Sequence, residues 1–407
     1  MRIFVVIGFI WPFWSFEQIT SIEADKQLLW EISHPKLKEK SFLFGTIHSN
    51  EKRVFDLADS VYVLMDKAKV IVLETDIFAL FNKMDSRKDL PITQYDNNGN
   101  PYSASFRASK TAYGDENGMP QFLDAFFEEY CFNHKKQFFA LESYDAQVSL
   151  LTSINYSSRK LINSSLNNFA QDKLMDLYLQ GDIQGLDKLT KASLSMDPEL
   201  YPKLISSRNI RMVSQLDSLL RNQNSFFCAV GAAHLGGSEG LVKLLRERGY
   251  RMRNVGWTIN EQPSKIKKRI RTERFFAYKD VNSGLTAIFN GKPYVEKYTD
   301  GSVKMIYREL GQGNTYVVEV FPLDTTSTVD QIAATYIASP PNTLFRKRFL
   351  EDGTIQFEGL SDTYPEGLNW VRVQFNATHF SVIKVYGGNK FLHSDRPQKF
   401  FDKVWFE

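Results

Sequence analysis

This chain of 407 residues has few cysteines, few histidines and a small net charge, and each of these features argues against a class of protein. Two cysteines, Cys131 and Cys228, cannot form a disulfide framework, although the sequence leaves open one bridge between them. Fifty basic and forty-seven acidic residues nearly balance, so the charge gives no case for a nucleic-acid partner. No H-E-x-x-H motif occurs, which excludes a metallopeptidase of the zincin type.

The N-terminus is typical of an export signal. Met1 and Arg2 give a short positive end, residues 3–16 are apolar apart from Ser15, and Ala24 is a small residue before "DKQLLWEI". We therefore expect residues 1–24 to be a cleaved signal peptide, and the protein to be exported to the periplasm or the extracellular space without a stable membrane span. An uncleaved signal would instead anchor the protein in a membrane.

The next part of the chain, over residues 25–258, alternates apolar strand-like runs with helical periodicity, which is typical of an α/β domain. We expect strands at "SFLFGTI", "KVIVLE", "QFFALE", "SFFCAVGAAH" and "YRMRNVGW". Helices are expected at residues 57–68, along "LNNFAQDKLMDLYLQGD", and after "SFFCAVGAAH", with Ser238 as N-cap and Gly249 as the C-terminal stop. The polar residues 85–119 indicate a loop or lid.

The composition changes after a basic stretch at residues 259–274, which we expect to be a solvated linker. Residues 275–407 contain short β-like runs such as "GLTAIFNG", "NTYVVEVFP", "WVRVQFN" and "HFSVIKVYGG", with one helix expected at about residues 328–337. The predicted fold class is therefore an α/β domain of two strand–helix halves, followed by a smaller α+β domain that is mostly antiparallel sheet.

Two of the six histidines follow strands in matching Gly-x-x-His contexts, at His48 and His234. Two further strands end in Glu74 and Glu142. Because strand ends in α/β folds meet at one edge of the sheet, and because glycine tolerates a sharp turn, we expect these four side chains to cluster there.

Two imidazoles and one or two carboxylates are a suitable donor set for a divalent transition metal with an open water position. The second carboxylate could then serve as general base in the attack of water on a carbonyl. The alternative is that the histidines are capping or packing residues and the glutamates pair with basic side chains. "GGSEG" matches the nucleophile-elbow pattern, but the strand has ended before Ser238, so we interpret this serine as a helix cap.

These segments resemble the TraB/GumN family, which includes the Tiki-type metallopeptidases. The resemblance covers residues 27–257 and rests on "FLFGTIHS", "VIVLETD", "FFALESYDAQ", "YLQGDIQGL", "SSRNIRM" and "VGAAHLGGSEGLVKLLRERGYRMRNV". It implies an EreA/ChaN-like α/β fold of two pseudo-symmetric halves. It also implies a metal-dependent peptidase site that acts on peptide or protein substrates, with manganese or cobalt as the favoured metal and zinc as the alternative.

By the same resemblance, the metal ligands are His48, Glu74 and His234, and Glu142 is a fourth ligand or the general base. Arg208, in "SSRN", matches a recurring Arg-Asn pair and would hold a substrate carboxylate or carbonyl. A buried structural pair between Arg208 and one of the glutamates is the alternative.

The sequence therefore predicts an exported metal-dependent hydrolase, and above all a peptidase. The alternatives are a non-catalytic protein that sequesters a peptide or another ligand in the same cleft, and a metal-free, esterase-like hydrolase. The C-terminal "HFSVIKVYGG", followed by "FFDKVWF", resembles PsbP/Mog1-type domains, which implies a binding or positioning module. The oligomeric state is not indicated.

Overall fold

We describe a computed structural model of the chain, which covers residues 26–85, 110–111, 113–143, 145–146, 149–150, 168–222, 225–260, 264–324, 326–337, 346–363 and 367–407. The expected signal peptide and most of the expected loop at residues 85–119 lie outside these described residues. Within them, the structure contains no helix with the length and apolar character needed to cross a membrane.

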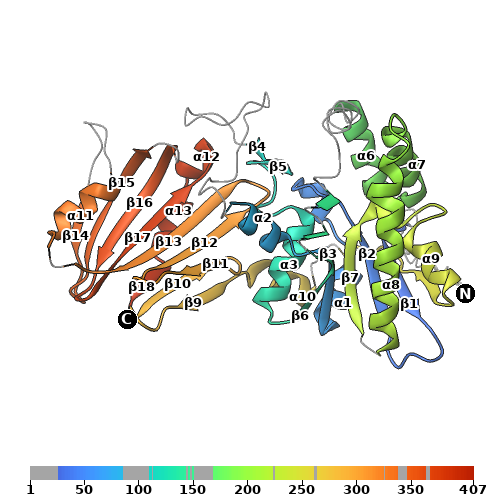
Figure 1. The fold of residues 1–407 in the computed structure, drawn as a ribbon, viewed down its shortest axis with the longest axis horizontal. Helices are drawn as coiled ribbons and strands as arrows, with labels where there is room; N and C mark the ends of the chain where they lie inside the picture. The colour runs from blue at the N-terminus through green and yellow to red at the C-terminus, as the bar shows by residue number, and fades with distance from the viewer. Residues whose placement is uncertain are drawn as a thin grey trace, which may run out of the picture.

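A mixed β-sheet forms the centre of the N-terminal part of the chain (Figure 1). In the described residues its strands lie in the order β6-β3-β7-β2-β1-β8. Four neighbouring strands (β6, β3, β7 and β2) run parallel, whereas β1 is antiparallel to both of its neighbours. The strands are β1 (Leu29–Ser33), β2 (Ser41–Thr46), β3 (Val70–Thr75), β6 (Gln137–Glu142), β7 (Phe226–Gly231) and β8 (Arg251–Asn254).

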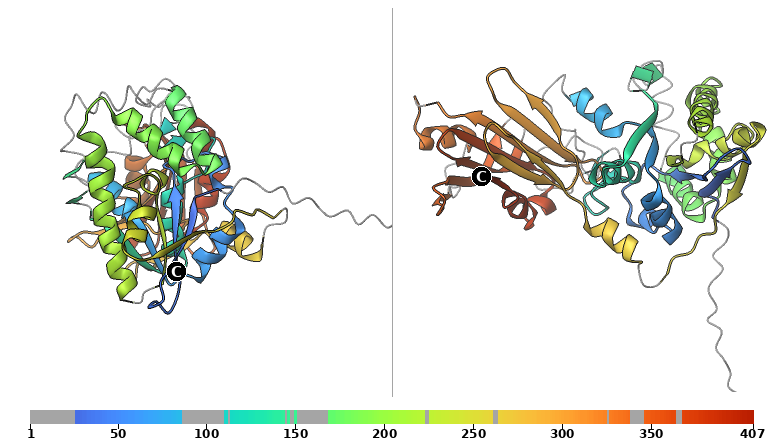
Figure 2. Two further views of the ribbon diagram at one scale, coloured as in Figure 1. Left: turned by 90° about the vertical axis from the view of Figure 1, so that its right-hand side faces the viewer. Right: turned by 90° about the horizontal axis from the view of Figure 1, so that it is seen from below.

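Helices cover both faces of this sheet (Figures 1 and 2), which explains why its central strands are apolar on both sides. One face carries α1 (Asp59–Lys67), α3 (Leu123–Asn133) and α10 (Lys265–Thr272), and the other carries α6 (Asn168–Gln180), α7 (Ile183–Leu194), α8 (Ser207–Arg221) and α9 (Leu241–Glu247). The remaining elements here are α2 (Ile77–Asp85), the hairpin β4 (Lys110–Thr111) with β5 (Gly114–Asp115), and the short segments η1 (Lys52–Phe55), η2 (Pro202–Ser206) and η3 (Ala232–His234).

The helix after β7 begins later than the sequence predicts, so the assignment of Ser238 as its N-cap is wrong. The N-cap of α9 is Gly240, which packs so closely that a Cβ there would lie 2.0 Å from the carbonyl oxygen of Gly236. Ser238 is exposed and lies outside the helix. Gly249 does end this helix, since its φ of +91° is a conformation that glycine adopts at little cost.

Half of the basic stretch that we expected to be a solvated linker is the helix α10, which covers 8 residues. Ser264 caps its first turn by accepting from the backbone N–H of Lys267. Ile270 is buried, and Lys267 is buried beside Asp59 of α1, with its Nζ 3.6 Å from the carboxylate. The apolar spacing of Ile266 and Ile270 therefore gives the helix one buried stripe despite its charge. The domain boundaries at 25–258, 259–274 and 275–407 stay a prediction.

The C-terminal part of the chain is mostly antiparallel sheet, in agreement with the predicted fold class (Figure 1). In the described residues one sheet has the order β11-β12-β13-β17-β16-β15-β14 and a second has the order β18-β10-β9. The elements are β9 (Phe276–Lys279), β10 (Leu285–Phe289), β11 (Tyr294–Lys297), β12 (Val303–Glu309), β13 (Asn314–Pro322), α11 (Val329–Tyr336), β14 (Arg346–Phe349), β15 (Ile355–Thr363), β16 (Gly367–Phe375), β17 (His379–Tyr386), α12 (Asn389–Leu392), α13 (Arg396–Phe401) and β18 (Val404–Phe406).

The helix expected at residues 328–337 is confirmed as α11, where Thr328 and Gln331 form a capping box. Both cysteines are free and buried, so the bridge that the sequence left open is absent in the structure.

Candidate functional site

The carboxyl ends of β2, β3 and β7 border a cavity of about 600 Å³. Four of the five residues singled out in the sequence line it: His48, Glu74, Arg208 and His234. They come from the segment after β2, from β3, from α8 and from η3, so they meet only in the folded chain. Glu142, at the end of β6, is not among the lining residues and pairs with Arg208.

The glycines of the two Gly-x-x-His segments do not serve as sharp-turn residues, contrary to our expectation. Gly45 is the fifth residue of strand β2, and Gly231 has a φ of −51°. A Cβ on Gly45 would lie 2.7 Å from Cδ1 of Leu235 and 3.0 Å from Cβ of Ala232, whereas on Gly231 the nearest atoms would be 3.5 Å away. Gly45 is therefore required because the segment that carries His234 packs directly on it.

His48 is held by a carboxylate that the sequence analysis did not identify. Its Nδ1 lies 2.9 Å from Oδ2 of Asp124, and the hydroxyl of Thr46 donates to the other oxygen of that carboxylate. Desolvation alone would lower the pKa of His48, but Asp124, with help from Glu74, outweighs it and raises the pKa to about 9. The contact through Nδ1 leaves Nε2 as the ring nitrogen that is available to the cavity.

His234 is oriented by the side-chain amide of Asn209. The amide nitrogen of Asn209 donates to the carbonyl of Glu239 at 2.7 Å, so its Oδ1 accepts the proton on Nδ1 of His234, also at 2.7 Å. The unprotonated Nε2 then lies 3.4 Å from Nη1 of Arg208 and 3.8 Å from Oε2 of Glu74. Burial, only partly offset by Glu74, lowers the pKa of His234 to about 4 and keeps the ring neutral.

Arg208 lies between the two glutamates. Its Nε donates to both oxygens of Glu142 at 3.0 and 3.1 Å, and its Nη2 donates to Glu142 at 2.8 Å and also contacts Glu74. Glu74 also accepts from the backbone N–H of Gly231 at 3.1 Å. Burial alone would raise the pKa of Glu74, but Arg208 and the two histidines hold it well below its usual value.

Asp124 and Asn209, which contact the two histidines, are the residues of the candidate site that the sequence analysis missed. Asp124 lies in the first turn of α3, far from any strand end, so its position gave no signal. Asn209 had a signal, since it is the second residue of the Arg-Asn pair in "SSRN". Each contacts Nδ1 of one of the two histidines, and neither lines the cavity of about 600 Å³.

The donor chemistry of the site fits a divalent cation. In the described part of the chain no three His, Cys, Asp or Glu side chains stand together as a metal-binding group. Even so, the Nδ1 of each histidine is fixed by an oxygen acceptor, the arrangement that orients metal-ligating histidines. A cation at Nε2 of His48 would displace the proton that the raised pKa keeps on this ring at neutral pH. Glu74 supplies an ionised carboxylate beside the two histidines, and it would exchange its contact with Arg208 for the cation.

These features define an α/β protein with a histidine- and glutamate-lined site at the carboxyl edge of a mostly parallel sheet. A model of the TraB/PrgY/gumN family matches residues 28–105 and 78–254, which is more than half of the chain. The chain belongs to this family, as the resemblance in its sequence predicted.

Two relatives are named as metalloproteases. The chain is 27% identical over 191 residues to the Metalloprotease TIKI homolog of Nematostella vectensis, and 23% identical over 313 residues to Metalloprotease TIKI2 of Danio rerio. These matches cover 39% and 56% of this chain, and they span only 40% and 60% of the two relatives. The solution structure of PsbP (CyanoP) from Synechocystis sp. PCC 6803 matches 33% of this chain and 93% of its own, with 10% identity and a TM-score of 0.26, a similarity too low to carry an argument.

Proposed function

We propose that this chain is an exported, metal-dependent peptidase in which His48, Glu74 and His234 are the metal ligands. The observation that carries the proposal is that two imidazoles, each fixed through Nδ1 by an outer-shell oxygen, line one cavity together with an ionised carboxylate. A divalent cation, with manganese or cobalt favoured by the family resemblance, would polarise a peptide carbonyl and activate a water there.

Arg208 is the group that we assign to substrate binding. Arg208 lines the cavity, and Glu142 accepts from its Nε and Nη2. Its Nη1 donates to the carbonyl of Leu204 at 3.2 Å and lies 3.4 Å from Nε2 of His234, so the hydrogen that faces His234 would become available to a substrate oxygen once that nitrogen binds the cation. Such a fixed donor stabilises negative charge that develops on a carbonyl oxygen during attack. This geometry favours a positioning role for Glu142, on Arg208, over its predicted role as fourth ligand or base.

A peptide is the substrate class that suits the cavity. Leu174, Met175 and Tyr178 of α6 line it together with the polar residues, so apolar side chains can be buried beside the reacting bond. The named metalloprotease relatives support the same substrate class.

The test is peptide cleavage by the purified protein, assayed with a peptide library in the presence of Mn²⁺ or Co²⁺ and again with a chelator. We expect cleavage that requires the cation, and a loss of kcat of about 10²–10³-fold in Arg208→Lys, which keeps the charge but loses the fork of donors. The control is His393→Ala, an exposed histidine of the C-terminal part. Binding without cleavage would favour the sequestering alternative, and cleavage that survives chelation would favour a metal-free hydrolase.

A further inference from the structure

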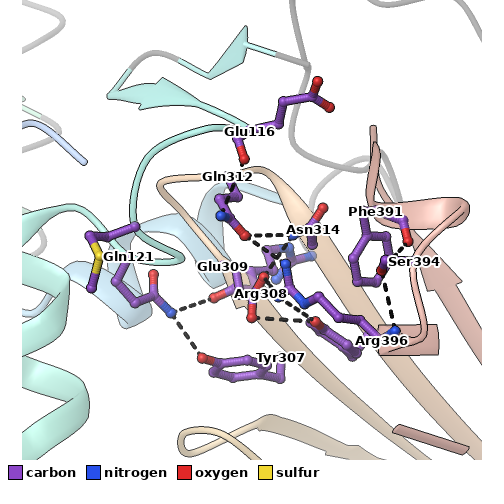
Figure 3. Close-up of polar contacts among 12 residues, drawn as sticks. Glu116, Gln121, Tyr307, Arg308, Glu309, Gln312, Asn314, Phe391, Ser394 and Arg396 are labelled. Carbon is purple, nitrogen blue, oxygen red and sulfur yellow. Dashed lines mark hydrogen bonds and ion pairs between the residues drawn. The ribbon is translucent and has the colours of Figure 1, made fainter. Parts of the chain in front are cut away.

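One tight turn of the C-terminal part of the chain, residues 310–313, contacts a residue that lines the cavity: the hydroxyl of Thr111 donates to the carbonyl of Gly311 at 3.1 Å. This turn joins β12 to β13 and is named the β12–β13 turn. Its backbone N–H groups at Gly311 and Gln312 both donate to the carbonyl of Pro120, at 2.9 and 3.1 Å. The N–H of Leu310 donates to the side chain of Gln121 at 2.8 Å, and Gln121 returns a bond to the carbonyl of Arg308 at 2.9 Å (Figure 3).

The side chain of Gln312 makes the second connection. Its Nε2 donates to the carbonyls of Gly118, at 2.8 Å, and Glu116, at 3.3 Å. Its Oε1 accepts from Nη1 of Arg396 at 2.8 Å, and Arg396 is itself held at 2.5 Å by the fully buried carboxylate of Glu309 (Figure 3). The Gln312 amide is therefore fixed on one side by the half-buried Arg396, which is paired with Glu309, and on its other side it holds the segment before α3.

That segment in turn holds the loop that follows His48. The N–H of Asn50 donates to the carbonyl of Tyr113 at 2.9 Å, and the carbonyl of Asn50 accepts from the N–H of Met119 at 2.7 Å. The side chain of Asn50 donates to the carbonyl of Asp115 at 2.7 Å. The ring of Tyr113 also packs edge-on against the ring of His48, with 5.9 Å between their centroids.

The contact between the turn and this loop is also direct. A Cβ on Gly311 would lie 2.7 Å from Cβ of Asn50 and 2.7 Å from the carbonyl oxygen of Met119. Beside it, Leu310 is 2% exposed and is buried in an apolar cluster with Phe122, whose ring contacts His48 edge-on. No side chain larger than that of glycine fits at residue 311, so the two parts of the chain are fitted closely to each other at this point.

We propose that the β12–β13 turn is a positioning element for His48, so that the C-terminal part of the chain completes the site from outside the region that the family model matches. The turn clamps residues 113–121, and these residues fix the loop at Asn50, two residues from His48. The consequence for catalysis rests on the proposed peptidase function, whereas the structural coupling does not.

The experiment is hydrogen–deuterium exchange on the full chain with the variant Gln312→Glu. This change keeps the acceptor for Arg396 but replaces the donor with an oxygen that faces the carbonyls of Gly118 and Glu116. The matched control is Gln356→Glu on β15, where the side chain donates across the sheet to Gln374. We expect amide exchange in peptides covering residues 47–51 and 113–123 to rise at least about tenfold in Gln312→Glu alone, with β7 unchanged.

A second variant is needed in case Arg396 pairs with the new carboxylate of Gln312→Glu and the turn keeps its position. Gly311→Ala places a methyl group against Asn50, whereas the control Gly256→Ala meets nothing within 4 Å. Unchanged exchange at residues 47–51 in both Gln312→Glu and Gly311→Ala would overturn the proposal. Where turnover is measurable, we expect kcat to fall more than tenfold with KM changed less than threefold, while equal losses in the controls would overturn the positioning role. A wild-type protein without turnover would count against the peptidase and leave the exchange result intact.

Discussion

Replacing Gly45 by alanine should destabilise the protein, because this glycine forms the contact between the two histidine-bearing segments. The new Cβ would lie 2.7 Å from Cδ1 of Leu235 and 3.0 Å from Cβ of Ala232, both closer than normal carbon contacts. Leu235 can shift its terminal methyl group, but Ala232 can move only with the backbone of η3. Overpacking of this kind lowers the free energy of unfolding by about 1–3 kcal/mol. The lower entropy of alanine than of glycine in the unfolded chain offsets about 0.4–1 kcal/mol of this loss.

Gly231→Ala is the matched control, since it alters the glycine of the other Gly-x-x-His segment. Its backbone angles, φ −51° and ψ 131°, suit alanine, and the nearest atoms to a Cβ would be 3.5 Å away. We therefore expect this variant to be neutral or to gain about 0.4–1 kcal/mol. Urea unfolding followed by tryptophan fluorescence measures both variants. Equal midpoints for Gly45→Ala and Gly231→Ala would refute the packing argument, because only the former has a steric clash.

Three further predictions concern protonation and thiol chemistry. Asp124→Asn should lower the pKa of His48 from about 9 toward its ordinary 6.5, as followed by NMR titration; an unchanged value would remove Asp124 as the cause. The carboxylate of Glu31 has a lowered pKa, chiefly because it accepts from Arg253, so it stabilises the fold above pH 4.5 and loses this effect as the pH falls through the lowered value. Glu31→Gln should thus cost about 1 kcal/mol in urea unfolding at pH 7 and progressively less in acid, and a cost that is constant with pH would contradict this. Both cysteines are buried with raised pKa values, so alkylation should require unfolding, and rapid labelling of the native protein would show that at least one is accessible.

Much of the fold follows from local sequence pattern. Apolar runs predicted the strands β2, β3, β6 and β7, because buried parallel strands are apolar on both faces. The expected strand in "YRMRNVGW" is also present, as β8, but it is antiparallel to β1 at the end of the sheet order and its two arginines are exposed. The sequence misled where tertiary packing decides the outcome. α10 is rich in charge, yet Ile270 and the pairing of Lys267 with Asp59 keep it helical against α1. Ser238 has a side chain that could cap a helix, but the N-cap is Gly240, which packs closely against the carbonyl of Gly236, so the helix begins later.

The sequence predicted four of the residues that line the cavity, but it did not predict Asp124 and Asn209, which contact the two histidines. Gly-x-x-His segments and strand-end glutamates both lie where strands end, and strand ends meet at one edge of the sheet. The local sequence was therefore enough to predict that His48 and His234 line one cavity. Asp124 comes from the first turn of α3, 76 residues from His48 along the chain, and no local pattern connects the two. The β12–β13 turn lies more than 250 residues from His48 along the chain, so only the folded structure shows that the two are linked.

The central claim is that His48 and His234 bind one cation together, and metal titration tests it most directly. Isothermal titration of the purified, metal-stripped protein with Mn²⁺ or Co²⁺ should give one site per chain. His48→Ala and His234→Ala should each weaken that site by more than about 100-fold, because loss of an outer-shell partner alone costs about 10–100-fold. His393→Ala should leave the affinity unchanged. Wild-type affinity and stoichiometry in both His48→Ala and His234→Ala would contradict the account.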